Sequence, residues 1–442
     1  MNDPRRPESY AAIARLVWPL ALGMLNNAVL QFVDRVFLAH ESMASLEAAL
    51  PAAMLASIVM CFFQSVVAYS GTFVAQYFGA GDRLGMEQSY RAGVRIALVS
   101  GLLCAALVPT GLKLMPLLLS SAEVCARART YYAIVSCGAL ALCGQMAASS
   151  YFTGQGRTRF VFWVNLGGNL LNIALDPLLI FVCRLGIAGA AYATVFAMFC
   201  QWLVLAGVAR RERLKTSTPP GSPWPLVVKI LRFGVPSGAY SVLNLLSFTV
   251  FLFVTGWVGD LDFAVSNACF SVNWLLIAPM EGFAIGASVL VAQAQGRGDS
   301  LSARVALRRT LLLALSLVAL LSLGAVAAHR PILELFVSPG VPGATFHALG
   351  FKLVVLMAVW QVFDAADVVI SGALKGAGDT AFVMWWMVFV AFGVWLPLVG
   401  VVRLVANTMP ALWCTMVVYV VVIAAGSALR WRRGRWARHK LV

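Results

Sequence analysis

The sequence predicts an all-α integral membrane protein with twelve transmembrane helices, arranged as two six-helix lobes related by pseudo-two-fold symmetry. Two observations predict this class. First, 61% of the 442 residues are hydrophobic, only 12% are charged, and the mean hydropathy is +0.85. A soluble domain carries about 25% charged residues, so this chain cannot present an ordinary hydrated surface. Second, one block of sequence occurs twice, about half a chain apart.

Twelve apolar stretches are long enough to cross a bilayer core, which takes a helix of about 20 residues. Some of them, such as residues 311–328, contain no charged residue. In chain order, we place the spans at residues 14–39, 48–78, 93–119, 131–153, 160–183, 187–209, 226–258, 264–295, 305–328, 346–373, 381–402 and 408–429.

The repeated block follows the second span of each half. Residues 74–82 read VAQYFGAGD and residues 291–299 read VAQAQGRGD. The glycines suit a tight turn with positive φ, and we expect Asp82 and Asp299 to cap the helices that follow. Repeats with an even number of spans are parallel and are related by an axis along the membrane normal, an architecture of secondary transporters.

The clearest linker separates six spans from six. Residues 210–225 read RRERLKTSTPPGSPWP and combine basic, hydroxyl and proline residues. We therefore predict two domains: an N-terminal six-helix lobe over residues 1–215, and a C-terminal six-helix lobe over residues 216–442 that ends in a basic tail.

The basic residues predict the orientation in the membrane. The net charge is +15, and 25 of the 33 Lys and Arg residues fall on the side of the spans that holds both termini. By the positive-inside rule, both termini lie in the cytoplasm. The tail at residues 430–440 is then attracted to anionic lipid at about 1 kcal/mol per charge. This distribution favours membrane lipid over nucleic acid as the partner.

Metal-binding patterns are absent from the sequence. The nine cysteines are scattered without a CxxC pair, and the four histidines show no HExxH pattern. Because buried cysteines most often act as small apolar residues, we predict neither a metal site nor a bound cofactor.

The candidate functional residues of the first half are acids deep within spans. An acid at a helix centre costs about 2.5–3.5 kcal/mol on insertion scales, so its presence needs a reason. Asp34 lies in NNAVLQFVDRVFL and Asp176 in NLLNIALDPLLIF. Asn172 precedes Asp176 by four residues and shares its helix face. Together these oxygens can form a pocket for protons or a small cation. The alternative is that Asp34 pairs with Arg35 while Asp176 ends a helix.

The second half does not repeat these acids. Its deep acids are Glu281, in APMEGFAIGASVL, and the pair Asp364 and Asp367, in WQVFDAADVVISGAL. The pair is three residues apart and shares a helix face. These three acids form a possible second-lobe site. The alternative is that Asp364 and Asp367 are acids at a helix end near the membrane interface.

The chain resembles the multidrug and toxic compound extrusion (MATE) family of antiporters over essentially its whole length. The most specific match is NIALDPLLIF at residues 172–181, followed by GIAGAAYAT at residues 186–194. Asp34, the two glutamine–glycine blocks and GALKGAGDT at residues 372–380 fit as well. The resemblance implies an antiporter that exports organic cations or other amphipathic compounds against H⁺ or Na⁺. It is then no enzyme, and we expect a functional monomer in the bacterial inner membrane.

The resemblance also assigns residues. Asp34, Asn172 and Asp176 fall on the first-lobe site for the coupling cation or proton, and Asp364 falls on a second-lobe acid. One position departs from the family: Asn244 stands where members often carry a glutamate. This departure favours H⁺ over Na⁺, although Glu281 can supply the missing charge.

Two other functions remain open. The first is a flippase for lipid-linked oligosaccharides of the same superfamily, but few basic residues lie deep in this chain. The second is a membrane prenyltransferase, since Asp364-x-x-Asp367 resembles half of its Mg²⁺ site, but a second aspartate-rich motif is missing. For an exporter of flat cations, five tryptophans are candidates for cation–π contacts: Trp257, Trp274, Trp360, Trp385 and Trp386.

Overall fold

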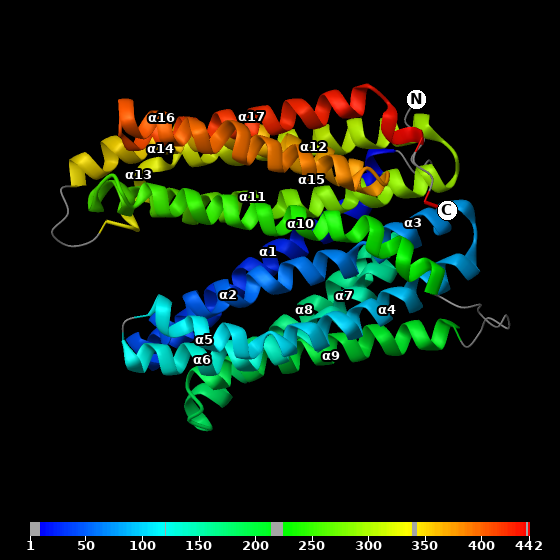
Figure 1. Cartoon of the computed structure of the whole chain (residues 1–442), viewed down its shortest axis with the longest axis horizontal. Coiled ribbons are helices and arrows are strands. Elements are labelled where there is room, and N and C mark those ends of the chain that lie inside the picture. Colours follow the sequence, from blue (N-terminus) through cyan, green and yellow to red (C-terminus); the bar gives the residue numbers. More distant parts are fainter. Residues whose placement is uncertain (1–8, 120, 214–223, 338–342, 439–440) are drawn as a thin grey trace. The chain divides into compact units, whose positions relative to one another are not determined.

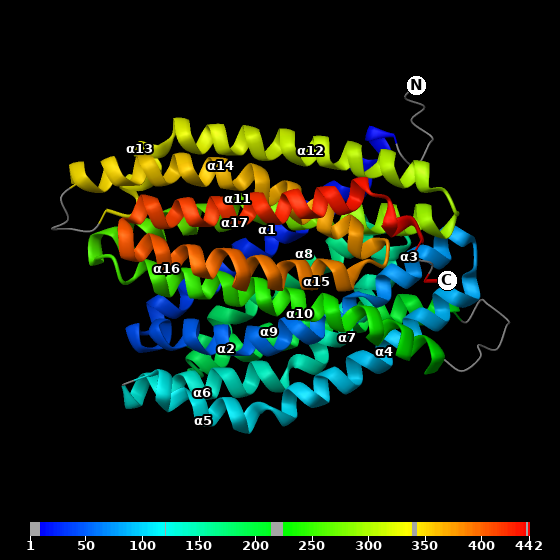
Figure 2. The ribbon, with the colours of Figure 1, turned by 45° about the horizontal axis from the view of Figure 1, so that its top comes forward.

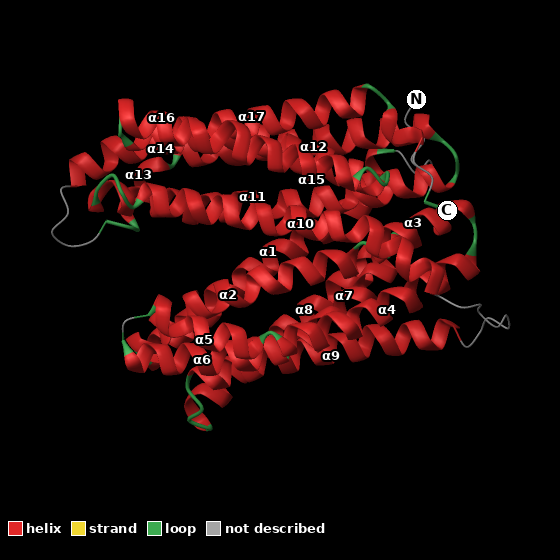
Figure 3. Ribbon diagram, in the orientation of Figure 1, coloured by secondary structure: helices red, strands yellow, loops and turns green. Residues whose placement is uncertain are grey.

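The computed structural model describes residues 9–119, 121–213, 224–337, 343–438 and 441–442. All regular structure in this part of the chain is helical (Figure 3). Ten helices are long and apolar enough to cross a membrane, or up to twelve when each of two bent helix pairs is counted as one span. The predicted all-α membrane fold is therefore confirmed.

The helices follow the predicted spans in order (Figure 1). Those of the first half are α1 (Tyr10–Glu41), α2 (Met43–Ala68), α3 (Ser70–Ala80), α4 (Arg83–Ala106), α5 (Val108–Leu118), α6 (Ala122–Cys137), α7 (Ala139–Gly154), α8 (Thr158–Pro177), the π-helical turn η1 (Leu178–Val182) and α9 (Ile187–Arg213). Those of the second half are α10 (Trp224–Thr255), α11 (Asp260–Gly296), α12 (Ser300–Ala327), α13 (His329–Glu334), α14 (Gly343–Gly376), α15 (Thr380–Val388), the π-helical turn η2 (Phe389–Trp395), α16 (Leu396–Val405), α17 (Met409–Arg432) and η3 (Arg435–Arg438).

Two spans of the first half are bent where the sequence supplies a helix breaker. The third span bends by 45° between α4 and α5, next to Pro109, and the fourth bends by 41° between α6 and α7, at Gly138. Proline lacks the N–H that would continue the hydrogen-bond ladder, and sharp kinks concentrate at such positions.

The repeated block forms the predicted turn in both halves. Gly81 and Gly298 adopt left-handed φ angles of +75° and +72°, which cost glycine little. Asp82 Oδ1 accepts from Gly85 N at 2.9 Å, and Asp299 Oδ1 accepts from Ser302 N at 3.0 Å. The predicted helix caps are confirmed at both sites.

The two copies of the block also meet each other. A Cβ atom at Gly79 would overlap the carbonyl oxygen of Gln293, and one at Gly296 would overlap the carbonyl oxygen of Gln76. Each glycine therefore lies directly against the backbone of the glutamine in the other copy. Gln293 Nε2 donates in addition to Gly154 O at 2.9 Å. The repeat thus forms a helix crossing in which the missing side chains allow backbone contact.

The chain divides into two compact units that exchange helix segments. One unit contains residues 22–242, 292–298 and 441–442, and the other contains residues 1–21, 243–291 and 299–440. In the latter, the first half of α1 packs on α11, where Trp18 and Phe283 meet edge to face at 6.0 Å. The predicted domain boundary at residues 215 and 216 lies outside the described residues and stays a prediction.

The first half of α10 makes the corresponding contact with α2 in the other unit. A Cβ atom at Gly238 would lie 2.8 Å from Phe62 O, and the hydroxyls of Ser65 and Ser241 are 2.7 Å apart. Small residues allow helices to approach closely in a membrane. A Cβ atom at Gly282 on α11 would likewise overlap the backbone of Ala21 on α1, so each unit holds its extra helix segment through a close approach at a glycine.

The unit built mostly from the second half is centred on α14. This helix packs against α12 and α17, and the three lie side by side in both Figure 1 and Figure 2. On another face it meets α11 closely: a Cβ atom at Gly372 would lie 2.5 Å from Ala284 O, and one at Gly376 would overlap the backbone of Ser288. The glycines of the GALKG segment therefore bring α14 against α11.

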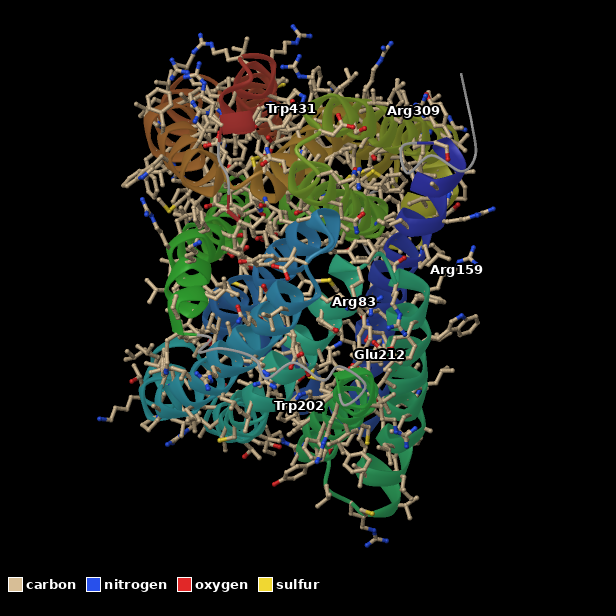
Figure 4. All side chains as sticks on the ribbon, turned by 90° about the vertical axis from the view of Figure 1, so that its right-hand side faces the viewer. Arg83, Arg159, Trp202, Glu212, Arg309 and Trp431 are labelled. Atoms are coloured by element: carbon tan, nitrogen blue, oxygen red, sulfur yellow. The ribbon has the colours of Figure 1, made fainter. Side chains whose placement is uncertain are left out.

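An ion pair joins the start of α15 to the end of α17. Arg430 Nε and Nη2 donate to the Asp379 carboxylate at 2.6 and 3.0 Å, and the guanidinium lies 4.7 Å from the centroid of Phe382. The first half carries a comparable pair with the charges exchanged, because Arg157 at the start of α8 donates to Glu212 at the end of α9 at 2.6 Å. Figure 4 labels Glu212 of the first-half pair, and also Trp431, the residue that follows Arg430 in the sequence.

We expect Arg430→Ala to lower the free energy of unfolding by about 3 kcal/mol, because it leaves the buried Asp379 carboxylate without its bidentate partner. Thermal unfolding of the purified protein in detergent measures this. Arg432→Ala, which removes an exposed arginine from the same helix end, is the matched control. Equal melting temperatures for the two variants would contradict the assigned role of the pair.

Candidate functional site

Three polar side chains of the first half meet between α1 and α8. Asp176 and Asn172, both on α8, are 0% and 1% exposed, and Asp34 on α1 is half-buried. In the amide orientation that satisfies both of its polar atoms, Asn172 Nδ2 donates to Asp34 Oδ1 and to Asp176 Oδ2, each at 3.2 Å. The structure therefore brings together the three residues predicted for the first lobe.

Thr194 on α9 fixes the direction of the Asn172 amide. Its backbone N–H donates to Asn172 Oδ1 at 2.9 Å. With the oxygen satisfied in this way, the amide N–H groups point at the two acids. The sequence reasoning quoted Thr194 as the end of the GIAGAAYAT segment but gave it no role. Because Thr194 lies 22 residues after Asn172 in the sequence, their contact could not be predicted from the spacing.

The two carboxyl groups lie close enough to interact directly. In the described part of the chain, the buried Asp176 Oδ1 has no hydrogen-bond donor. Two adjacent carboxylates repel each other unless a positive charge joins them, and one shared proton is the simplest such charge. Tyr131 on α6 and Arg35 on α1 are within electrostatic range. The Asp34–Asp176 pair can therefore take up and release one positive charge.

The helix changes its geometry directly after Asp176. Pro177 has no N–H, and the chain continues as the π-helical turn η1, in which Cys183 N donates to Leu178 O at 2.9 Å. Such turns inside α-helices are frequent at functional sites. A Cβ atom at Gly189 would lie 2.7 Å from the backbone of Leu179, so the glycine lets α9 pack against this turn and bring Thr194 to the site.

The second-lobe acids also form a cluster. Asp367 is buried, and its Oδ1 accepts from Ser427 Oγ at 2.7 Å and from Ser371 Oγ at 3.1 Å. Electrostatic interactions join Asp364 to both Asp367 and Glu281. Both aspartates lie well inside the 34-residue helix α14, so they are not acids at a helix end.

Lys375 is the functional candidate that the sequence reasoning missed in this cluster. It lies eight residues after Asp367 on the same face of α14, and it interacts with Glu281 and Asp367. Helical side chains lean toward the N-terminus of their helix, which directs Lys375 toward the acids. Its place within GALKGAGDT was visible in the sequence, but the proximity of α11 was not.

Asn244 is exposed on α10. Among the described residues, no hydrogen bond or ion pair joins it to Glu281, Asp364 or Asp367. The hydrogen bonds therefore do not link Asn244 to the second-lobe acids, and its part in a second-lobe site stays a prediction.

The five tryptophans predicted to contact a cation differ in their surroundings. Trp360 is 4% exposed and lies against Phe270 and Trp413. Trp386 stacks on aromatic neighbours, and the Arg403 guanidinium lies 4.2 Å from the Trp257 ring centroid. The prediction is therefore wrong for Trp360, which is buried in the core of its unit. Trp385, Trp257 and Trp274, at 64%, 59% and 54% exposure, are the most open of the five.

Comparison with known proteins places these residues in a family. A family model described as MatE matches residues 19–178 and 236–401. The two matched segments start 217 residues apart, which is the spacing of the repeated block. Multidrug resistance protein NorM of Burkholderia vietnamiensis is 29% identical over 402 residues, which cover 87% of this chain and 85% of that protein. Probable multidrug resistance protein NorM of Bradyrhizobium diazoefficiens is 24% identical, with 88% and 84% covered.

Solved structures agree on the fold. One described as the outward-facing conformation of a multidrug resistance MATE family transporter of the MOP superfamily has a TM-score of 0.86 at 20% identity, covering 97% of this chain and 96% of that one. A MOP superfamily transporter from Pyrococcus furiosus has a TM-score of 0.85 at 20% identity, covering 98% and 97%. The family model spans both halves of the repeat, and the chain belongs to the MatE family of multi-pass membrane transporters.

Proposed function

We propose that this protein is a cation-coupled antiporter that exports organic cations and other amphipathic compounds across the plasma membrane by alternating access. The relatives named above carry the name multidrug resistance protein, which supports the class of substrate. The protein works as a monomer in the bacterial inner membrane, surrounded by lipid, and catalyses no chemical reaction.

The observation that carries the proposal is the bridged acid pair, Asp34 and Asp176, held by Asn172 inside a membrane span. Ionisable residues are expensive at this depth and mark ion pathways. A carboxyl group shielded from water can bind and release a proton near neutral pH. The pair therefore supplies a site at which one cation alternates with the substrate.

The coupling ion is H⁺ or Na⁺, and three observations favour H⁺. A single proton suffices to join the two carboxyl groups. Asn172 already occupies the position between them with its N–H groups, which would repel a metal cation. In the second lobe, Asn244 stands where family members often carry a glutamate, and among the described residues no hydrogen bond joins it to the acids there.

The orientation follows from the basic loops. The turns that follow the repeated blocks, the linker and the tail carry most of the Lys and Arg residues. We therefore place both termini in the cytoplasm, where residues 430–438 lie beside anionic lipid headgroups.

We expect expression of the protein in a bacterium that lacks its major efflux pumps to lower the accumulation of ethidium or a similar lipophilic cation several-fold. Energised cells loaded with the dye, with and without Na⁺ in the medium, measure the efflux. Efflux that continues without Na⁺ and stops with a protonophore indicates H⁺ coupling.

The same assay separates the alternatives. A protein that reaches the membrane but exports no member of a panel of cationic and zwitterionic amphiphiles contradicts the drug-export proposal. The oligosaccharide flippase then becomes the better candidate, and transfer of a fluorescent lipid-linked sugar across vesicles tests it directly.

A further inference from the structure

A chain of hydrogen-bonded carboxamides, three of them buried, lies in the same unit as the acid pair. Gln145 Nε2 on α7 donates to Asn165 Oδ1 on α8 at 3.0 Å. Gln201 Nε2 on α9 is within 3.3 Å of both Asn165 O and Asn169 Oδ1. Asn169 Nδ2 donates in turn to Asn27 Oδ1 on α1 at 2.9 Å. Four helices thus contribute to one continuous run of amide groups.

The helix periodicity aligns this run with the acid pair. Asn165, Asn169, Asn172 and Asp176 follow one another on α8 at spacings of four, three and four residues, so they share one face. On α1, Asn27 and Asp34 are seven residues apart, as are Asn169 and Asp176 on α8, which places the amide contact two turns from the acid contact. The arrangement is therefore two successive polar layers on one face of α8.

The packing makes room for this run. A Cβ atom at Gly168 would overlap the Gln201 amide, so the glycine lets Gln201 lie flat against α8. Gln145, Asn169 and Gln201 are at most 9% exposed. Apolar side chains would suffice if these helices only had to pack against one another. Five carboxamides in one layer therefore indicate a further role.

The run and the acid pair together cover much of the membrane thickness. From Asn165 to Asp176 the rise along α8 is about 16 Å, more than half of a hydrocarbon core of about 30 Å. Asn165 lies about 10 Å from the start of α8, the end at which Arg157 and Glu212 are both more than one-third exposed. The carboxamides therefore extend from the acid pair toward the arginine-rich side.

Carboxamides suit the passage of a cation better than its storage. Their oxygens can solvate a cation or orient water, but they carry no charge that would hold the ion. The hydrogen bonds described above use about a third of the donors and acceptors that five carboxamides offer. An interhelical hydrogen bond in a membrane contributes only about 0.6 kcal/mol on average, so water can replace an amide partner at small cost.

We propose that this carboxamide run is the inner part of the path by which the coupling cation moves between the Asp34–Asp176 pair and the cytoplasmic side, within this one unit. The inference rests on the proposed antiport function. The cation moves as a proton carried by water molecules that the amides hold, or as Na⁺ solvated by their oxygens.

The test replaces Gln201 by methionine, which has a similar length and no amide. Gln361→Met is the matched control, because Gln361 is an equally buried glutamine bonded to Asn273 at 2.8 Å in the other unit. Purified variants are reconstituted in proteoliposomes, and substrate-driven movement of H⁺ or Na⁺ is followed with ion-sensitive dyes. We expect Gln201→Met to slow cation movement at least tenfold and to leave the substrate Kd within twofold, whereas Gln361→Met leaves both unchanged.

Asn169→Leu provides a second variant should Gln201→Met fold poorly, and the same loss of cation movement is expected. Equal rates for the Gln201 and Gln361 variants overturn the path and leave the amides as links between helices. A wild-type protein that exports substrate without moving either cation overturns the coupling itself. The two failures are therefore distinguishable.

Discussion

Replacement of Asp34 by asparagine is expected to abolish gradient-driven efflux while the protein folds and reaches the membrane. Asparagine keeps an oxygen that can accept from Asn172 and adds an N–H that can donate to Asp176. The variant therefore imitates the state in which the acid pair holds its proton, and it cannot leave that state. Because a buried carboxyl group is removed, the melting temperature should equal or exceed that of the wild type.

The expected loss follows from the energetics of coupling. One charge that crosses a potential of 100 mV supplies about 2.3 kcal/mol, and each pH unit across the membrane adds about 1.4 kcal/mol. At about 1.4 kcal/mol per factor of ten, one proton sustains a concentration ratio above tenfold for a neutral substrate. Without the titrating group that ratio falls to one. Accumulation of dye in everted vesicles should therefore fall to the level of vesicles that lack the protein.

Asp260→Asn is the matched control, since Asp260 is exposed in the first turn of α11. This variant should transport at the wild-type rate. If Asp34→Asn also transports at the wild-type rate with an unchanged pH dependence, the first-lobe coupling site is wrong. Glu281 and Asp364 then become the candidates, and Lys375 beside them gains importance as the positive charge they already hold.

The first-lobe site could be predicted from the sequence because the features that identify it lie within short segments of the chain. An acid in an apolar span is conspicuous, and the spacing of Asn172 and Asp176 fixes their shared face. Thr194, Gln201 and Lys375 could not be assigned in the same way. Their roles depend on which helix lies opposite, and hydropathy predicts that a span exists but not its neighbour. The tryptophans show the same limit, because composition cannot tell a binding aromatic from Trp360 in the core.

The fold followed more fully from the sequence, since twelve apolar stretches in a membrane leave the backbone little choice but helix. The bends between α4 and α5 and between α6 and α7 were not predicted, because a proline or glycine in a span can be accommodated without a bend. The exchange of helix segments between the compact units was also missed. It depends on small residues such as Gly238, and the role of this glycine in the contact with α2 can be recognised only from the structure.

The repeated block carries the second large prediction. We expect Gly79→Val and Gly296→Val each to prevent accumulation of folded protein in the membrane. A Cβ atom at either position would overlap a carbonyl oxygen of the facing backbone, and a backbone cannot move aside as a flexible side chain can. The smaller changes Gly79→Ala and Gly296→Ala should each lower the free energy of unfolding by about 1–3 kcal/mol, measured by thermal unfolding in detergent.

Gly167→Ala is the control for these changes, because a Cβ atom there would meet nothing within 4 Å. It should be neutral or slightly stabilising, since alanine favours a helix over glycine. The two alanine variants should also be non-additive. Both enlarge one helix crossing, so once the first alanine has separated the helices, the second meets less resistance. Additive losses in the free energy of unfolding would mean that Gly79 and Gly296 act at separate contacts. Losses no larger than that of Gly167→Ala would contradict the helix crossing itself.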